Sequence, residues 1–387
     1  MLSRGVPAIS GHSILDREAS SNHRLSSVII GTGAFIPAHT CAGSDFLDHE
    51  FFEDYGRPCD PADNEEIVKK FEAITEISDR RYASDELVAS DLGLYAAEAA
   101  LASAEIDKET LDYLIVAHNF GDVRHDNRRT EMVPSLAARV KHRLGIRNPG
   151  CVAYDLPFGC PGWLQAVIQA DYYLRSGDAR RALVIGAEIL SRVSDPHDRD
   201  SMIYADGAGA VILEAQPTNG AGILAHATRS DTYEHAWLLR MDRSYDPAYP
   251  DDSLFLKMQG RKLYEYALAT VPEVVRSSLE GAGVELRQVA KVLLHQANGK
   301  MDKAILKRLF KLEGIGEVPD DILPMTISSL GNSSVATLPT LLDLIVKGRL
   351  DGHRIDKGDI LVFASVGAGM NINSLVYRWG DRPHASG

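Results

Sequence analysis

Short apolar runs separated by polar and glycine-rich stretches recur along this chain. The runs are much shorter than a membrane span and rich in β-branched residues, which predicts strands buried on both faces. They lie at residues 27–31, 111–116, 182–186, 292–294 and 361–363, and a further run ends at Tyr154. The glycine-rich stretch 204–209 predicts a turn into another strand, because no Gly-Lys-Ser/Thr follows it as in a phosphate loop.

Segments with helical spacing of apolar residues alternate with these strands. After the run ending at Tyr154, Leu164, Ile168 and Leu174 share one helix face, and Gly177 is the stop signal. Further helices are expected at residues 44–52, 64–74, 91–104 and 333–347, and before Leu144. Strands that alternate with helices in this way predict a layered α/β architecture with two packed sheets.

The second half of the chain repeats the order of the first. The apolar positions of residues 101–116 recur at 279–294 in the same order of helix, turn and strand. Two related halves are therefore expected, residues 25–217 and 218–387, with chance similarity of apolar patterns as the alternative. Residues 1–24 are polar and unpatterned, which predicts a flexible arm.

Composition narrows the possible classes of protein. At 387 residues and 45% hydrophobic content, the chain can bury a large core without disulfides or metals. Its net charge of −13 disfavours general nucleic-acid binding. Four irregularly spaced cysteines without a secretory signal predict a cytoplasmic protein and no zinc site. No apolar run approaches the roughly 18 residues that a membrane span requires.

Candidate chemistry centres on Cys160, in the sequence Gly-Cys-Pro-Gly at residues 159–162. The thiol is expected at a strand-to-helix turn, with Pro161 as the first helical residue. Unpaired N–H groups and the positive end of the helix dipole favour a thiolate there, as a nucleophile requires. A lone cysteine is also often a small buried apolar residue, which is the alternative.

Two further polar residues occupy comparable positions in the second half. His295 directly follows a predicted strand, and Asn332 precedes the helix that mirrors the one after Cys160. An α/β fold gathers its chemistry at such strand ends and helix starts. A histidine after a strand and an asparagine in a turn are also common structural features, so both interpretations stay open. The glycine-rich stretch 366–369 offers backbone N–H groups for an oxyanion.

Together these motifs resemble the β-ketoacyl-acyl-carrier-protein synthase III family of the thiolase superfamily. The resemblance covers residues 26 to 379 and implies a thiolase-like five-layer αβαβα fold and a homodimer. It rests on Gly-Cys-Pro-Gly at Cys160, Asp-Gly-Ala-Gly-Ala from Asp206, His-Gln-Ala-Asn at His295, Gly-Asn-Ser-Ser at Asn332 and the Gly-Ala-Gly from Gly367.

The resemblance implies a decarboxylative Claisen condensation. Cys160 would take an acyl group from a thioester, and His295 and Asn332 would stabilise the enolate formed from a malonyl- or β-ketoacyl-type thioester. The backbone N–H groups of Cys160 and Ala368 would form the oxyanion hole. Substrates would arrive as phosphopantetheine or coenzyme A thioesters, with no further cofactor and no metal.

The resemblance also implies an acyl carrier protein as partner. Lys300, Lys307 and Arg308 match the basic surface on which the family docks this acidic protein, and a solvated helix face is the alternative. Asn298 and Arg199 match substrate-binding positions near the entrance of the site.

Two departures from the family pattern concern the substrate. The tryptophan and Arg-Thr-Gly-Ile stretch that hold the coenzyme A nucleotide are replaced by Lys70 and by Ile-Thr-Glu-Ile at residues 74–77. The segment 118–134 is long for a loop in an α/β unit, which predicts a functional loop. In the family, this segment borders the acyl pocket at the dimer interface. Both departures favour a longer or β-oxidised acyl group, delivered on a carrier protein, over acetyl-coenzyme A.

Related activities remain as alternatives. A thiolase is disfavoured because no second cysteine lies near the glycine turn at residues 366–369, and chalcone synthases carry a different glycine-rich signature there. An acyltransferase or thioester hydrolase would use Cys160 and His295 without decarboxylation. A non-catalytic subunit of a heterodimeric synthase is disfavoured by the intact triad. A dialkylresorcinol-type ketosynthase that joins two acyl chains is consistent with the departures.

Overall fold

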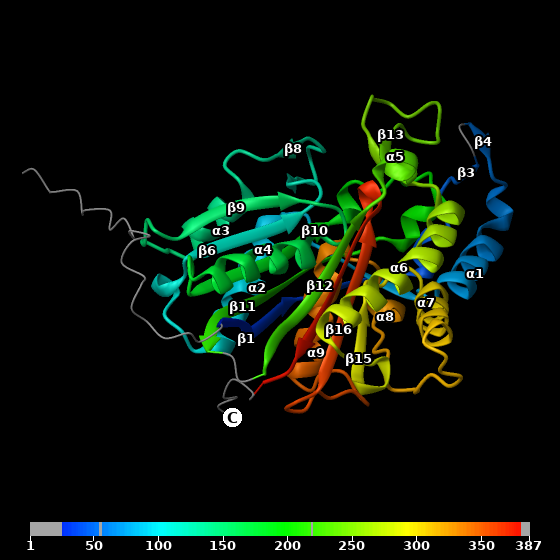
Figure 1. Cartoon of the computed structure of the whole chain (residues 1–387). Coiled ribbons are helices and arrows are strands. Elements are labelled where there is room, and N and C mark those ends of the chain that lie inside the picture. The colour runs from blue at the N-terminus through cyan, green and yellow to red at the C-terminus, as the bar shows by residue number, and fades with distance from the viewer. Residues whose placement is uncertain (1–24, 54–55, 218–219, 381–387) are drawn as a thin grey trace, which may run out of the picture.

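Two β-sheets, one from each half of the chain, organise the molecule. The computed structural model describes residues 25–53, 56–217 and 220–380. The first sheet has the order β1 (Leu25–Phe35), β11 (Asp206–Pro217), β10 (Arg181–Ile189), β6 (Tyr113–His118) and β9 (Val152–Pro157). The second has the order β12 (Gly222–Ser230), β17 (Asn371–Arg378), β16 (Ile360–Gly367) and β15 (Val289–Leu294), and it lies beside the first in Figure 1.

The two sheets share one pattern of strand pairing. In the first, β11 pairs antiparallel with β1 and β10, and β10 pairs parallel with β6. In the second, β17 pairs antiparallel with β12 and β16, and β16 pairs parallel with β15. The repeat predicted from the sequence is therefore confirmed. β9, parallel to β6, extends the first sheet by one strand.

Helices form three layers around and between the sheets. α2 (Ala89–Ala104) and α3 (Leu136–Arg143) bury their apolar faces against the first sheet. α6 (Gly260–Ala282) and α7 (Gly299–Leu312) do the same against the second. α4 (Gly162–Ser176) and α9 (Thr337–Val346) share a core with strands of both sheets. The five-layer αβαβα fold is thereby confirmed.

The middle layer depends on the apolar character of its two helices. All residues of α9 from Thr337 to Ile345 are buried, as expected for a helix that is largely apolar all round. Trp163 of α4 is 2% exposed, and burial of such a side chain stabilises the fold by about 1.5–3 kcal/mol. The helices also require close backbone contact, since a Cβ on Gly186 in β10 would lie 2.3 Å from Val335 O.

Short elements complete the described chain. The helices are α1 (Asn64–Thr75), α5 (Thr232–His235) and α8 (Ile327–Leu330). Two-stranded sheets pair β2 (His39–Ala42) with β5 (Asp79–Tyr82), β3 (Phe52–Glu53) with β4 (Arg57–Pro58), β7 (Asp122–Val123) with β8 (Thr130–Glu131), and β13 (Leu239–Asp242) with β14 (Phe255–Met258).

The long segment 118–134 is braced by contacts with the neighbouring helices α2 and α3. Its buried Asp122 carboxylate accepts hydrogen bonds from the backbone and hydroxyl of Ser90, at 2.8 and 2.7 Å, and pairs with Arg139 at 2.8 Å. The segment ends with two exposed apolar side chains, Met132 at 42% and Val133 at 90%. An ordered segment that presents apolar side chains to solvent is typical of an interaction surface.

The helix predicted over residues 44–52 is wrong. The structure has only a 3₁₀ turn at Gly43–Phe46. Asn64 Nδ2 donates to the carbonyls of Leu47 and His49, at 2.8 and 2.7 Å, which satisfies backbone groups that a helix would otherwise pair.

Two other boundaries differ from the sequence-based expectation. Residues 206–209 are part of β11 and not a turn before it. α9 begins at Thr337 and not at residue 333, because Ser334 has a φ of +54°, which a right-handed helix does not accommodate. Ser334 instead belongs to a 3₁₀ turn, Ser334–Ala336.

The remaining expectations concern the N-terminal residues, membrane spans, cysteines and metal sites. Residues 1–24, expected as a flexible arm, lie outside the described residues. In the parts of the chain that the structure describes, no helix combines the length and the apolar character needed to cross a membrane. All four cysteines are free thiols. No group of His, Cys, Asp or Glu side chains within the same described ranges is arranged to hold a metal ion.

Candidate active site

Cys160 lies in the turn between β9 and α4. β9 ends at Pro157, Gly159 adopts a left-handed φ of +68°, and α4 begins at Gly162. Pro161 precedes the helix, one position earlier than expected. The thiol therefore faces the N-terminal end of a 15-residue helix, where the helix dipole favours a thiolate.

Burial opposes ionisation of this thiol. Loss of solvent raises the pKa of Cys160 to about 11, and the nearby Glu188 charge acts in the same direction. Hydrogen bonds from the Ser334 hydroxyl and from the Cys160 backbone lower the pKa. The reactivity of Cys160 thus depends on donors placed around its sulfur atom.

Ser334 connects the three predicted catalytic residues. Its hydroxyl donates to Cys160 Sγ at 3.3 Å, and its backbone N–H donates to Asn332 Oδ1 at 2.8 Å. The ring of His295 lies beside the same backbone, which raises the pKa of the imidazole. The structure therefore brings Cys160, His295 and Asn332 together around one residue.

Asn332 is fixed through its backbone. Its N–H donates to Ile203 O at 3.0 Å, and its carbonyl accepts from Ala205 N at 2.8 Å. The side-chain oxygen is occupied by Ser334. The amide nitrogen is therefore the end of Asn332 that can donate to a ligand.

His295 is buried at the end of β15, with 6% of its surface exposed. Its backbone N–H donates to Ala364 O at 2.8 Å, which fixes it beside β16. Burial lowers the pKa of the imidazole to about 4, although the neighbouring Ser334 backbone acts in the opposite direction. Among the described residues, Nδ1 has no hydrogen-bond partner. The ring is therefore neutral at pH 7 and can act as a donor and an acceptor.

The two turns predicted to form an oxyanion hole touch each other. A Cβ on Gly367 would lie 2.5 Å from the backbone nitrogen of Cys160, and a Cβ on Gly159 would lie 2.8 Å from Ala368 N. Glycine at both positions lets the backbones meet closely. The backbone nitrogens of Cys160 and Ala368 thus belong to turns packed against one another, as an oxyanion hole requires.

Sequence analysis missed three residues of this site: Ser334, Asn119 and Glu188. Asn119 Nδ2 donates to Ser334 Oγ at 2.9 Å, and Asn119 N donates to Glu188 Oε2 at 2.9 Å. Burial raises the pKa of Glu188 to about 7. The second serine of Gly-Asn-Ser-Ser was a usable signal for Ser334. Asn119 follows β6 directly, whereas nothing in the sequence marks Glu188 within its apolar strand.

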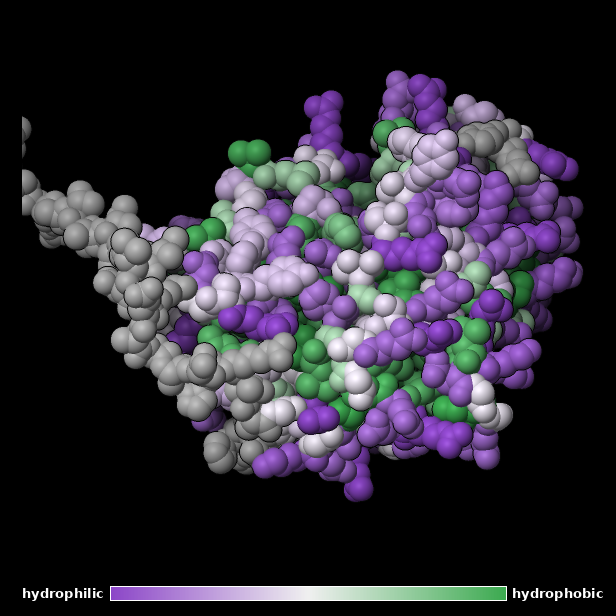
Figure 2. Space-filling model, viewed as in Figure 1, coloured by the Kyte–Doolittle hydropathy of each residue, from purple (hydrophilic) through white to green (hydrophobic). Residues whose placement is uncertain are grey.

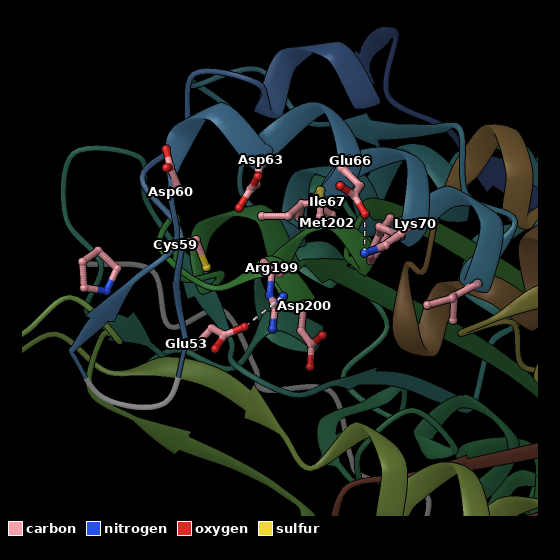
Figure 3. Close-up of a pocket in the computed structure, with 13 residues that line it drawn as sticks. Glu53, Cys59, Asp60, Asp63, Glu66, Ile67, Lys70, Arg199, Asp200 and Met202 are labelled. Carbon is pink, nitrogen blue, oxygen red and sulfur yellow. Dashed lines mark ion pairs between the residues drawn. The ribbon is translucent and has the colours of Figure 1, made fainter.

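A cavity of about 610 Å³ lies where the family resemblance places the nucleotide clamp. Lys70 and Arg199 line it, but each is paired with a carboxylate, Lys70 with Glu66 at 2.5 Å and Arg199 with Glu53 at 3.6 Å (Figure 3).

Carboxylates outnumber cations in this cavity, which we call the entrance cavity. Asp60, Asp63 and Asp200 add to the two paired carboxylates, against Lys70 and Arg199 as the cations lining it. Burial and the neighbouring Asp198 raise the pKa of Asp200 to about 6, so it is mostly ionised at pH 7. The entrance cavity is therefore acidic.

The predicted carrier-binding residues lie apart from Cys160, on α7. Lys300, Lys307 and Arg308 are exposed, and their spacing places them on one side of the helix. Hydrophilic side chains dominate the surface over α6 and α7 (Figure 2). Asn298 Oδ1 accepts from Met301 N at 3.1 Å and so caps α7, while its predicted contact with substrate stays a prediction.

Comparisons with known proteins agree with this architecture. Residues 154–232 match the family model described as 3-oxoacyl-[acyl-carrier-protein (ACP)] synthase III, and residues 279–379 match its C-terminal counterpart. The chain is 33% identical to the β-ketoacyl-[acyl-carrier-protein] synthase III of Paracoccus denitrificans, over 91% of this chain and 99% of that protein. It is 31% identical to the protein of the same name from Bradyrhizobium sp., over 92% and 99%.

A solved structure shows the same fold. The 3-oxoacyl-[acyl-carrier-protein] synthase III of Aquifex aeolicus superposes with a TM-score of 0.73 at 28% identity, covering 91% of this chain and all of that one. The fold and the comparisons define a condensing acyltransferase of the thiolase superfamily. The chain belongs to the β-ketoacyl-acyl-carrier-protein synthase III family.

The lowered pKa of His295 predicts a specific pH dependence of stability. In the unfolded chain the imidazole binds a proton below its ordinary pKa of 6.5, whereas in the folded chain it does so only below about 4. Its contribution to folding stability is therefore present above pH 6.5 and is lost as the pH falls from 6.5 to 4.

Urea unfolding of the wild type and a His295→Asn variant, between pH 7.5 and 4, measures this effect. The wild type should lose stability relative to the variant as the pH falls through this window. A constant difference in unfolding free energy across the range would contradict the neutral histidine.

Proposed function

We propose that this enzyme joins a Cys160-bound acyl group to a malonyl- or β-ketoacyl-type thioester by decarboxylative Claisen condensation. The observation that carries the proposal is the junction at Ser334, which contacts Cys160, Asn332 and His295. A thiol at a helix start, beside a neutral imidazole and an amide donor, suits acyl transfer followed by enolate chemistry.

In the first step, Cys160 acts as the nucleophile. Its thiolate attacks the carbonyl carbon of an acyl thioester, and the resulting oxyanion accepts hydrogen bonds from the backbone N–H groups of Cys160 and Ala368. The tetrahedral intermediate collapses, the carrier sulfur leaves as a thiolate, and the acyl group remains on the sulfur of Cys160. The contact between the Cys160 and Gly367 turns supports this assignment.

In the second step, His295 and Asn332 act on the extender thioester. Loss of carbon dioxide leaves an electron pair that moves onto the thioester carbonyl as an enolate, which accepts hydrogen bonds from both side chains. The enolate carbon attacks the acyl-cysteine carbonyl, and Cys160 leaves as thiolate. Each donor can contribute about 3 kcal/mol of barrier lowering. A neutral His295 suits this role because it can donate without adding a buried charge.

The acyl donor is a carrier protein in this proposal. The acidic entrance cavity disfavours the phosphates of a coenzyme A nucleotide, and its two cations are already paired. A carrier protein delivers only the phosphopantetheine arm, so its nucleotide-free thioester avoids this repulsion. The acyl group itself is proposed to be longer than acetyl or β-oxidised, as in ketosynthases of the dialkylresorcinol type. Four free cysteines fit a cytoplasmic site of action.

A homodimer is the proposed assembly. The braced segment 118–134 ends at Met132 and Val133, whose exposed apolar side chains suit burial by a second copy of the chain. In such a dimer this segment would border the acyl pocket and influence chain length.

The first prediction separates acylation from condensation. Cys160→Ala should abolish covalent acylation, whereas His295→Ala and Asn332→Ala should keep most of it and lose condensation by at least about 100-fold, because the enolate needs side-chain donors. Intact-protein mass spectrometry measures the acyl adduct, and carbon dioxide release from malonyl-carrier protein measures decarboxylation.

Two outcomes would argue against this assignment. A stable acyl adduct on the Cys160→Ala protein would exclude Cys160 as the nucleophile. Acyl transfer or hydrolysis by the wild type without any carbon dioxide release would favour the acyltransferase or hydrolase alternative.

The second prediction concerns the donor. When acetyl-coenzyme A and medium-chain acyl-carrier proteins compete at equal concentration, the mass added to Cys160 should be predominantly the longer chain.

Neutralising the entrance cavity with Asp60→Asn and Asp63→Asn should raise acylation by coenzyme A thioesters several-fold and leave carrier-delivered acylation unchanged, because it removes only repulsion of the nucleotide. Predominant acetylation of the wild type would instead indicate an ordinary initiating synthase.

The third prediction tests the carrier surface. Reversing the charges of Lys300, Lys307 and Arg308 to glutamate should weaken the use of carrier-protein substrates by at least about tenfold, with little effect on small thioester mimics. The loss should shrink above about 0.1 M salt, where the Debye length falls below about 10 Å. Arg180→Glu, an exposed charge reversal before β10, is the control. Equal losses on both substrate types would indicate damage to the fold or pocket.

A further inference from the structure

We infer that Ser334 is a further catalytic residue, and that Asn119 and Glu188 are positioning residues that direct its hydroxyl proton at the sulfur of Cys160. The inference deepens the proposed function and rests on it in one respect, the role of Cys160 as nucleophile. It assigns a source for the thiolate stabilisation that a buried cysteine needs.

The arrangement begins at Glu188, whose carboxylate can only accept hydrogen bonds once it is ionised, above its raised pKa of about 7. Glu188 Oε2 accepts from the backbone N–H of Asn119 at 2.9 Å and also from the Asn119 amide nitrogen. Since an amide oxygen facing a carboxylate would be repelled, the side chain of Asn119 is held with its nitrogen toward Glu188. Glu188 thus sets the orientation of the Asn119 amide.

The same amide nitrogen reaches Ser334. Asn119 Nδ2 lies 2.9 Å from Ser334 Oγ, and its second proton points there because Glu188 uses the first. A hydroxyl carries one proton only. Since Ser334 Oγ accepts from Asn119, its own proton is left for Cys160 Sγ, at 3.3 Å. The orientation is therefore passed along three residues to the sulfur atom.

The orientation of the hydroxyl matters because desolvation and the charge of Glu188 both oppose formation of the thiolate. Burial raises the pKa of the thiol, and the negative charge of Glu188 adds to it, whereas the Ser334 hydrogen bond lowers it. Glu188 therefore acts on the sulfur in two opposite ways, by its charge directly and through Asn119 and Ser334. A hydrogen bond to an ionised acceptor is about twice as strong as one between neutral groups, so the bond favours thiolate over thiol.

The backbone of Ser334 is held for this task. Ser334 is 2% exposed and adopts a φ of +54°, a left-handed conformation that is strained for a residue other than glycine. Its backbone N–H donates to Asn332 Oδ1, and the ring of His295 lies beside its backbone. Their contacts keep the hydroxyl beside Cys160 although the local conformation is unfavourable.

The test is alkylation of Cys160 by iodoacetamide, which reports thiolate content without any acyl substrate. The rate is measured on the full chain from pH 7 to 10, with Cys160 followed by peptide mass spectrometry. Ser334→Gly removes the hydroxyl and accommodates the positive φ. At pH 8, where Glu188 is ionised, this variant should react about tenfold more slowly, equivalent to one pKa unit. Ser333→Ala, which removes the neighbouring hydroxyl, should react like the wild type.

Asn119→Leu tests the relay itself. Alone, it should slow alkylation in the same direction as Ser334→Gly, because the hydroxyl is no longer oriented. In the Ser334→Gly background it should add no further loss, since Asn119 acts through Ser334. Additive losses would exclude the relay, and a wild-type alkylation profile in Ser334→Gly would exclude Ser334 as a catalytic residue. Either result would leave condensation by the wild type, and with it the proposed function, intact.

Discussion

The contact between the start of α4 and the turn before α9 determines how the remaining structure is arranged. Both helices are buried between the two sheets. Their N-terminal ends meet at a place where the neighbouring backbones lie too close together to leave room for a side chain. Gly186 provides this space next to Val335, and Gly367 provides it next to Cys160. The sheets and outer helices fix these positions, and the catalytic groups are brought together by the same packing that forms the core.

Burial at this contact changes the chemistry of every titratable group near it. Desolvation raises the pKa of Cys160 and Glu188 and lowers the pKa of His295, so the uncharged form is favoured in each case. A neutral imidazole is useful to a growing enolate, but a neutral thiol is not a nucleophile. In the proposed mechanism, the helix dipole and the Ser334 hydroxyl therefore offset the desolvation that keeps His295 neutral, so the site meets two opposite requirements.

The repeated α/β order was predictable from apolar periodicity, and the grouping of Cys160, His295 and Asn332 from motifs at element ends, whereas the five layers were expected from the family resemblance. The absence of a helix at residues 44–52 was not predictable, since hydrogen bonds from Asn64 hold that backbone in another conformation. The role of Glu188 was not predictable either, because it depends on a contact with Asn119, which is distant in sequence. A pattern of residues along the sequence does not show which distant segments pair in space.

The interior and the entrance of the site follow different constraints. Inside, the proposed mechanism requires Cys160, His295 and Asn332 to lie together around Ser334. At the entrance, Lys70 and Arg199 form ion pairs with the solvent-exposed Glu66 and Glu53, whose replacement costs the fold little. The charge of the entrance cavity can therefore change while the condensation machinery stays the same. The acidic entrance next to an intact core is the combination expected when a condensing enzyme changes its donor rather than its reaction.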